Sequence, residues 1–261
     1  MRHNAHTARK RTAMIRFDVL SIFPELFDSY MSASIPGRAA AKHLFELHCH
    51  NLRTWTHDAH HSVDDAPFGG GQGMLMKPAP FFEAFDAMRA IDERNCHIVM
   101  FSPCGKKFTQ RIAEDLATKE RIVFACAHYE GVDERVYSQA DDVLSLGDFI
   151  LTGAELPCMV VMDSIVRLLP GALGDEMSSQ DESFSDTGLL EYAQYTRPQT
   201  YRDMQVPAVL LSGNHQEIAR WRRLNALERT ARWRPDLLAT AHITKQEYDF
   251  AQTIVSSEDL S

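Results

Sequence analysis

The chain has 261 residues, 44% of them hydrophobic, which is enough to form the core of one large domain or of a medium and a small one. No stretch approaches the roughly 18 consecutive apolar residues of a membrane-spanning helix, and five cysteines without a Cys-x-x-Cys pair argue against a disulfide framework or a zinc ribbon. The net charge of −9 disfavours nucleic-acid binding, yet six arginines against two glutamates gather between His215 and Arg234, and a docking surface depends on local charge.

The first residues, MRHNAHTARKRTAMIR, carry five Lys or Arg side chains and no acid. A transit peptide, a basic tail or an upstream start codon would each give this composition. A strand that begins just after Met14 favours a dispensable basic extension over 1–13. The segment has no apolar core of a secretion signal, and the odd number of cysteines indicates a reducing compartment. The sequence therefore predicts a cytoplasmic protein.

Strand-like and helix-like stretches alternate through the first two-thirds of the chain. Apolar runs predict strands at 17–23, 44–52, 97–102, 121–127 and 143–146. Helical spacing predicts helices at 24–32, 78–94, 109–119 and 155–169, with Phe81, Phe82, Phe85, Met88, Ile91, Ile112 and Leu116 on inward faces. This alternation predicts an α/β domain around a mostly parallel sheet over 14–174.

The composition changes after Gly174. The segment GDEMSSQDESFSDTG has five carboxylates, four serines and one phenylalanine, so it cannot bury enough apolar surface to order itself. It predicts a flexible interdomain linker over 175–188. The pattern beyond it is helical, with helices at 216–232 and 244–255, the second opened by a capping box of Thr244 with Glu247. A small helical domain over 189–261 is predicted.

Three segments with glycine or small polar residues directly follow predicted strands, at 102–105, 127–131 and 145–157. The carboxyl ends of parallel strands meet at one edge of a sheet, where ligands bind in α/β folds. Gly147 and Gly153 leave room for main-chain N–H and C=O groups to reach a purine edge. Each loop alone is more often a mere connection, but three at one edge predict a ligand pocket.

Two further segments are open to more than one interpretation. Residues 68–74, FGGGQGM, lack the Gly-Lys-Ser/Thr of a phosphate-binding loop. Two interpretations remain: the segment is the flexible tip of a hairpin, or its glycines allow the backbone to approach a ligand closely. His57, His60 and His61 suggest a metal site, but their spacing lacks the helical i, i+4 geometry and a separated third ligand. We therefore predict no metal site there.

In order along the chain, six motifs resemble the bacterial tRNA (guanine-N1)-methyltransferase family, TrmD. They are VDDAPFGGGQGMLMKP, HYEGVDERV, SLGDFILTGAELP, DSIVRLLPGALG, YTRPQTYRDMQVPAVLLSGNH and IARWR. The resemblance runs from about Met14 to about Leu238. It implies a SPOUT-type α/β domain with a deep trefoil knot, which no periodicity would predict because chains rarely thread their own loops. It also implies an obligate homodimer whose active sites are each built from both subunits.

The resemblance implies that S-adenosylmethionine is the methyl donor and lies in the knotted loop, its adenine held by backbone groups of 146–151. The contacts it implies are with Pro103, Ala127, Tyr129, Glu130, Gly131, Leu146, Gly147, Asp148, Phe149, Ile150, Leu151, Gly153 and Pro157. It makes Mg²⁺ possible without pointing to a ligand. Two positions depart from the family pattern, since Ala127 and Ala154 each stand where glycine is usual.

The substrate that the resemblance implies is guanosine 37 of tRNA, next to the anticodon. The anticodon stem-loop would be gripped by the helical domain of one subunit and the knotted domain of the other. The tRNA contacts implied are Gly69, Gly70, Ser183 and Arg220. The resemblance implies neither DNA nor a membrane as a binding partner.

The resemblance also implies the catalytic groups. Arg167 would stabilise the negative charge that develops on guanine O6. An aspartate just before Ser-Phe in the linker is the family's general base, and the aligned residue here is Glu182, preceded by Asp181. Glu182 is favoured and Asp181 stays open. A knotted methyltransferase acting on a ribose 2′-OH and a non-enzymatic binder descended from the enzyme are the competing hypotheses.

Overall fold

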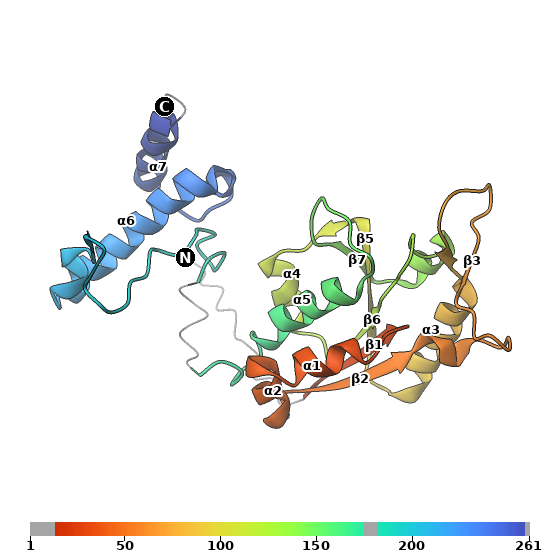
Figure 1. Ribbon diagram of the computed structural model, residues 1–261. Helices are drawn as coiled ribbons and strands as arrows, with labels where there is room; N and C mark the ends of the chain where they lie inside the picture. Colours follow the sequence, from red (N-terminus) through yellow and green to blue (C-terminus); the bar gives the residue numbers. More distant parts are fainter. Residues whose placement is uncertain (1–13, 175–181, 259–261) are drawn as a thin grey trace, which may run out of the picture. The chain divides into compact units, whose positions relative to one another are not determined.

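The computed structural model describes residues 14–174 and 182–258 of the chain. The chain divides into two compact units, Met1–Gly174 and Asp175–Ser261 (Figure 1). The first unit contains a five-stranded sheet and the second is mostly helical. Each unit is described by itself below.

The sheet of the first unit has the strand order β2-β1-β6-β5-β7, and every neighbouring pair is parallel. Its strands are β1 (Ile15–Ser21), β2 (Phe45–Asn51), β5 (Cys96–Lys107), β6 (Arg121–Ala125) and β7 (Asp142–Ser145). All five predicted strands are present, and the prediction of an α/β domain with a mostly parallel sheet is confirmed.

Helices cover both faces of this sheet. They are α1 (Leu26–Met31), α2 (Ser34–Ala41), α3 (Pro78–Ile91), α4 (Gln110–Leu116) and α5 (Glu155–Val166). Successive side chains of a strand point to opposite faces. Phe17 and Phe124 accordingly pack in one buried cluster with side chains of α1, α2, α4 and α5, whereas Leu20 and Ala125 pack in another with α3 (Figure 1).

Only some of the helix residues predicted to face inward are buried. Phe81, Phe85 and Met88 of α3 are buried, but Ile91 is 56% exposed because α3 ends there, beyond the edge of its cluster. Helix α2 was not predicted, since Pro36 and Gly37 near its start are typical of turns. Residues 68–74 join β3 (Asp64–Asp65) to β4 (Leu75–Met76), a short antiparallel pair.

Strand β5 runs five residues past its predicted end and pairs irregularly with β7. Phe101 and Lys106 both pair with Leu144, so residues 102–105 bulge out of the ladder. Gly105 returns the chain so close to β7 that a Cβ on it would lie 2.7 Å from the backbone of Leu144. The bulge therefore depends on glycine at this position.

We expect Gly105→Ala to lower the free energy of unfolding by about 1–3 kcal/mol, the usual range for overpacking against an unyielding neighbour. Urea unfolding followed by circular dichroism measures it. Gly174→Ala is the matched control, because a Cβ there would meet nothing within 4 Å. Equal stabilities of the two variants would show that the β5 bulge relaxes freely.

The second unit is built around two helices, α6 (His215–Trp233) and α7 (Lys245–Glu258), with a short antiparallel pair, β8 (Thr200–Tyr201) and β9 (Met204–Gln205). Its core contains Leu189, Leu227 and Leu238. The predicted capping box is confirmed: Glu247 N donates to Thr244 Oγ1 over 3.3 Å, and Thr244 N donates to Glu247 Oε2 over 2.8 Å.

Short 3₁₀ helices complete the connections. They are η1 (Leu52–Trp55), η2 (Glu134–Gln139), η4 (Ala208–Leu211) and η5 (Pro235–Ala239). Residues 182–188, within the predicted linker, belong to the second unit, and His242 N donates to Thr187 O over 2.9 Å. No helix among the described residues is long and apolar enough to span a bilayer.

Candidate active site

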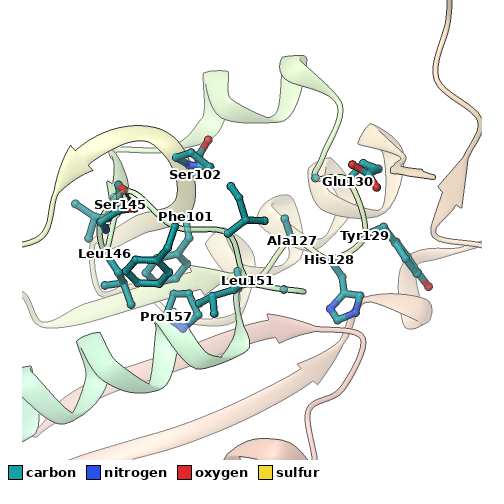
Figure 2. Close-up of a pocket in the computed structure, with 18 residues that line it drawn as sticks. Phe101, Ser102, Ala127, His128, Tyr129, Glu130, Ser145, Leu146, Leu151 and Pro157 are labelled. Carbon is teal, nitrogen blue, oxygen red and sulfur yellow. Dashed lines mark hydrogen bonds between the residues drawn. The ribbon is translucent and has the colours of Figure 1, made fainter. Parts of the chain in front are cut away.

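A cavity of about 360 Å³ opens where β5, β6 and β7 end (Figure 2). Its walls come from the bulge of β5, from the segment after β6 and from the long loop between β7 and α5. These are the three segments whose position after predicted strands indicated a ligand pocket. The parallel sheet brings them together because all three strands end at the same edge.

Local backbone conformation shapes each wall. Tyr129 and Gly131, after β6, have φ of 60° and 119°, and Gly147, after β7, has φ of 149°. Positive φ turns the chain sharply at the strand ends, a conformation that glycine adopts at no steric cost. Tyr129, a non-glycine residue in this region, is held by its neighbours: Gly131 N donates to His128 O over 3.1 Å.

Twelve of the thirteen residues predicted to contact the methyl donor line this cavity, and Asp148 does not. Asp148 is exposed on the loop after β7. The twelve are Pro103, Ala127, Tyr129, Glu130, Gly131, Leu146, Gly147, Phe149, Ile150, Leu151, Gly153 and Pro157. Ala154, named in the sequence as a departure near the donor, lines it too, and so do five residues that were not predicted as donor contacts: Phe101, Ser102, His128, Leu144 and Ser145.

The two alanines at positions where the resemblance implies glycine fit without backbone strain. Neither Ala127 nor Ala154 has positive φ, and Ala154 lies at φ −91°. Ala154 N donates to Ala127 O over 2.8 Å, so the two residues join the wall after β6 to the start of α5. Their methyl groups therefore add to the walls and leave the main-chain bonds intact.

The chemistry of the lining suits a flat, largely apolar ligand with a polar edge. Phe101, Leu146, Leu151 and Pro157 supply apolar walls, and Figure 2 shows them gathered at one end of the cavity. Behind Pro157, burial raises the pKa of the Cys158 thiol well above its usual value, so this thiol stays protonated. The site therefore offers shape and main-chain groups more than charge.

The glycine-rich loop lies over one side of this region. Met76 N donates to Gly131 O over 2.9 Å, and Glu130 N donates to Met74 O over 3.1 Å, which ties the loop to the segment after β6. A Cβ on Gly73 would collide with the Glu130 side chain. Gly69 and Gly70, at the tip, have positive φ and open space around them, as a contact with a large ligand requires.

The predicted catalytic residues lie in different units. Arg167 is the C-cap of α5, half-buried, with its N–H donating to Asp163 O over 3.1 Å. Glu182 belongs to the second unit, at a cavity of about 430 Å³ that Arg222 and Arg223 also line. Asp181 lies outside the described residues.

The remaining predicted tRNA contacts are on the second unit. Ser183 Oγ accepts a hydrogen bond from Glu191 N over 2.9 Å, and Arg220 is exposed on α6. On the same helix the Arg222 guanidinium stacks on the Tyr192 ring, 4.7 Å from its centroid. The basic stretch seen in the sequence is thus a helix with several exposed arginines.

The histidines near residue 60 have ordinary partners. His57 Nε2 lies 2.8 Å from Glu83 Oε2, and His61 Nδ1 lies 3.1 Å from Thr56 Oγ1. Across residues 14–174 and 182–258, no three His, Cys, Asp or Glu side chains gather as a metal ion would need.

The family of the chain follows from comparison with known proteins. The family model described as tRNA (Guanine-1)-methyltransferase TrmD matches residues 15–240. A tRNA (guanine-N(1)-)-methyltransferase of Dehalococcoides mccartyi is 47% identical to the chain over 246 residues, covering 94% of the chain and 99% of that protein. One from Caldanaerobacter subterraneus subsp. tengcongensis is 50% identical over 234 residues, covering 90% and 96%. The chain therefore belongs to the tRNA (guanine-1)-methyltransferase family, as its motifs predict.

Proposed function

We propose that the chain transfers a methyl group from S-adenosylmethionine to N1 of guanosine 37 in tRNA, in the cytoplasm. The observation that carries this proposal is the cavity at the ends of β5, β6 and β7, in a chain that belongs to a family of tRNA guanine methyltransferases. Its volume lies within the range of about 300–1,000 Å³ that is typical of small-molecule sites.

The residues of the cavity fit this methyl donor. The adenine would lie among the apolar side chains Leu146, Leu151 and Pro157, with its polar edge on main-chain groups of the loop after β7. When bound, S-adenosylmethionine supplies a methyl group on a positively charged sulfur, which a nucleophile attacks in line. No Mg²⁺ enters the proposal.

Two side chains would act on the guanine during methyl transfer. Guanine N1 carries a proton and is a poor nucleophile while it does, so a general base must accept that proton. We assign this role to Glu182. The electron pair left on N1 spreads to O6, where the Arg167 guanidinium would stabilise it. Since these residues lie in separate units, tRNA binding would have to bring them to one guanine.

Surfaces on both units would hold the tRNA. Gly69 and Gly70 would approach the anticodon loop from the first unit, because their open surroundings admit a base or a sugar. Ser183 and Arg220 would contact it from the second unit. Exposed arginines on α6 suit contacts with the phosphate backbone. Such contacts position the protein on the RNA but do not recognise its base sequence.

A homodimer and the trefoil knot belong to the same proposal. Large apolar side chains are exposed along the adjacent helices α1 and α5. They are Leu26 (48% exposed), Tyr30 (44%), Leu156 (59%) and Val160 (48%). Exposed apolar patches of this kind mark interaction surfaces. A second copy of the chain would bury them.

We expect Val160→Asp to convert a dimer into monomers of 29.6 kDa, because an aspartate buried at an interface would be desolvated without a partner. Light scattering after size-exclusion chromatography measures the mass. Ile91→Asp is the matched control, since Ile91 is 56% exposed on α3, at the other face of the sheet. A Val160→Asp protein that stays dimeric would place the interface elsewhere.

Methylation of an unmodified transcript tests the proposed activity. The protein is incubated with labelled S-adenosylmethionine and tRNA that carries guanosine at positions 36 and 37, and the product is mapped by mass spectrometry. Label on N1 of guanosine 37 is expected. Label on a ribose 2′-OH would favour the alternative knotted methyltransferase, and binding without any transfer would favour a non-enzymatic binder.

A further inference from the structure

A buried carboxyl group beside the cavity has no role in the proposed reaction. Glu155, the first residue of α5, is only 4% exposed and does not line the cavity. Ser21 Oγ donates to its Oε1 over 2.8 Å, and His128 Nδ1 lies 3.3 Å from its Oε2. A carboxylate can only accept hydrogen bonds, so against an ionised Glu155 the donor in this contact is Nδ1 of His128.

The partners of Glu155 come from two different strands. Ser21 is the last residue of β1 and is fully buried. Besides donating to Glu155, its Oγ accepts a hydrogen bond from Phe23 N over 2.9 Å. His128 follows β6, and its ring packs edge-on against Phe23 with centroids 5.1 Å apart. Glu155 thereby joins the start of α5 to the ends of β1 and β6.

The same junction forms one wall of the cavity. His128 and Gly153 make an antiparallel bridge, and Ala154 N donates to Ala127 O over 2.8 Å. All four of these residues line the cavity. A Cβ on Gly153 would collide with both His128 Nδ1 and Glu155 Oε2, so the wall segments touch where the carboxyl group lies.

We propose that Glu155 is a positioning residue for the methyl-donor cavity. By holding His128 in its Nδ1-protonated form against Gly153, it fixes the spacing between the segment after β6 and the segment that enters α5. The inference rests on the proposed function, because it takes the cavity as the donor site. Without Glu155, Ser21 and His128 would each lose a partner, and the two segments would be held only by main-chain bonds.

Calorimetric titration of the full chain with S-adenosylhomocysteine, the demethylated donor, tests this without tRNA. Glu155→Ala should weaken binding about tenfold, the effect of losing one buried hydrogen-bonded junction. Glu155→Gln should lie between this variant and the native protein, because its amide keeps one acceptor. Leu116→Ala is the stability control: Leu116 is fully buried on α4 and does not line the cavity, so its truncation destabilises the fold while every lining side chain stays unchanged.

A second measurement separates positioning from a general loss of stability. Nitrogen-15 spectra of the imidazole rings should show His128 protonated at Nδ1 in the native protein and at Nε2 in Glu155→Ala. Unchanged affinity in Glu155→Ala, equal weakening in Leu116→Ala, or an unchanged His128 tautomer would each overturn the inference. A native protein that does not bind S-adenosylhomocysteine would instead contradict the proposed function itself.

Discussion

Replacing Glu182 with glutamine should slow methyl transfer in a single turnover by about 10²–10⁴-fold, the usual contribution of a general base. Glutamine keeps the length of the side chain and an accepting oxygen, but it cannot take the proton from guanine N1. Rapid quenching of enzyme in excess over tRNA, with saturating S-adenosylmethionine, isolates this step from product release. The affinity for S-adenosylmethionine should stay the same, because the base acts on the guanine.

Glu191→Gln is the matched control for this variant. Glu191 lines the same cavity of the second unit as Glu182, so the same change of charge is made nearby without removing the proposed base. We expect its rate to stay close to that of the native chain. If Asp181→Asn is slow and Glu182→Gln is not, the base lies one residue earlier; if neither is slow, the base is not in this segment.

Replacing Asp18 with alanine should lower the free energy of unfolding by about 3–5 kcal/mol, the usual result of removing one partner of a buried ion pair. Asp18 and Arg121 are both fully buried. Arg121 Nε and Arg16 Nε each donate to Asp18 Oδ2 over 2.8 Å, and His50 Nε2 lies 2.8 Å from Oδ1. Without Asp18, the hydrogen-bond partners left to the buried Arg121 guanidinium would all be neutral, such as Met88 O at 2.7 Å.

The same carboxyl group should give the fold an acid-sensitive part of its stability. Burial alone would raise the pKa of Asp18, but hydrogen bonds from His50, Arg16 and Arg121 outweigh it and hold the pKa well below its usual range. A carboxyl whose pKa is lowered on folding stabilises the fold above its unfolded pKa of about 3.9 and loses this contribution as the pH falls through the folded value. The native protein should therefore lose stability in acid more steeply than Asp18→Ala.

Urea unfolding between pH 7 and pH 3 measures both effects. Asp115→Ala is the control, because its ion pair with Lys119, at 3.0 Å, joins the end of α4 to the turn that follows it at the surface and contributes only about 0.2–1 kcal/mol. An Asp18→Ala protein as stable as this control would mean that Arg121 finds another partner after relaxation.

The prediction of the parallel sheet succeeded most directly at its central strand, β6, which is apolar on both faces. In β6, Ile122 and Phe124 face one cluster while Val123 and Ala125 face the other, and such a run is visible in the sequence as an unbroken apolar segment. Helix α2 and the pair β3–β4 were missed, because short elements with proline, glycine or acidic residues carry no periodic signal. The trefoil knot and the homodimer stay predictions from the family resemblance.

The sequence by itself determined the α/β class, the three strand-end segments of the cavity and, through six motifs in order, the family. Each of these depends on residues that are near one another in the chain. Only the tertiary structure placed His128 and Gly153 against each other, joined Glu155 to Ser21 across 134 positions, and buried Asp18 with Arg121. Such pairings depend on strand order, and strand order is set by the packing of all the helices on the sheet at once, which no local pattern of residues encodes.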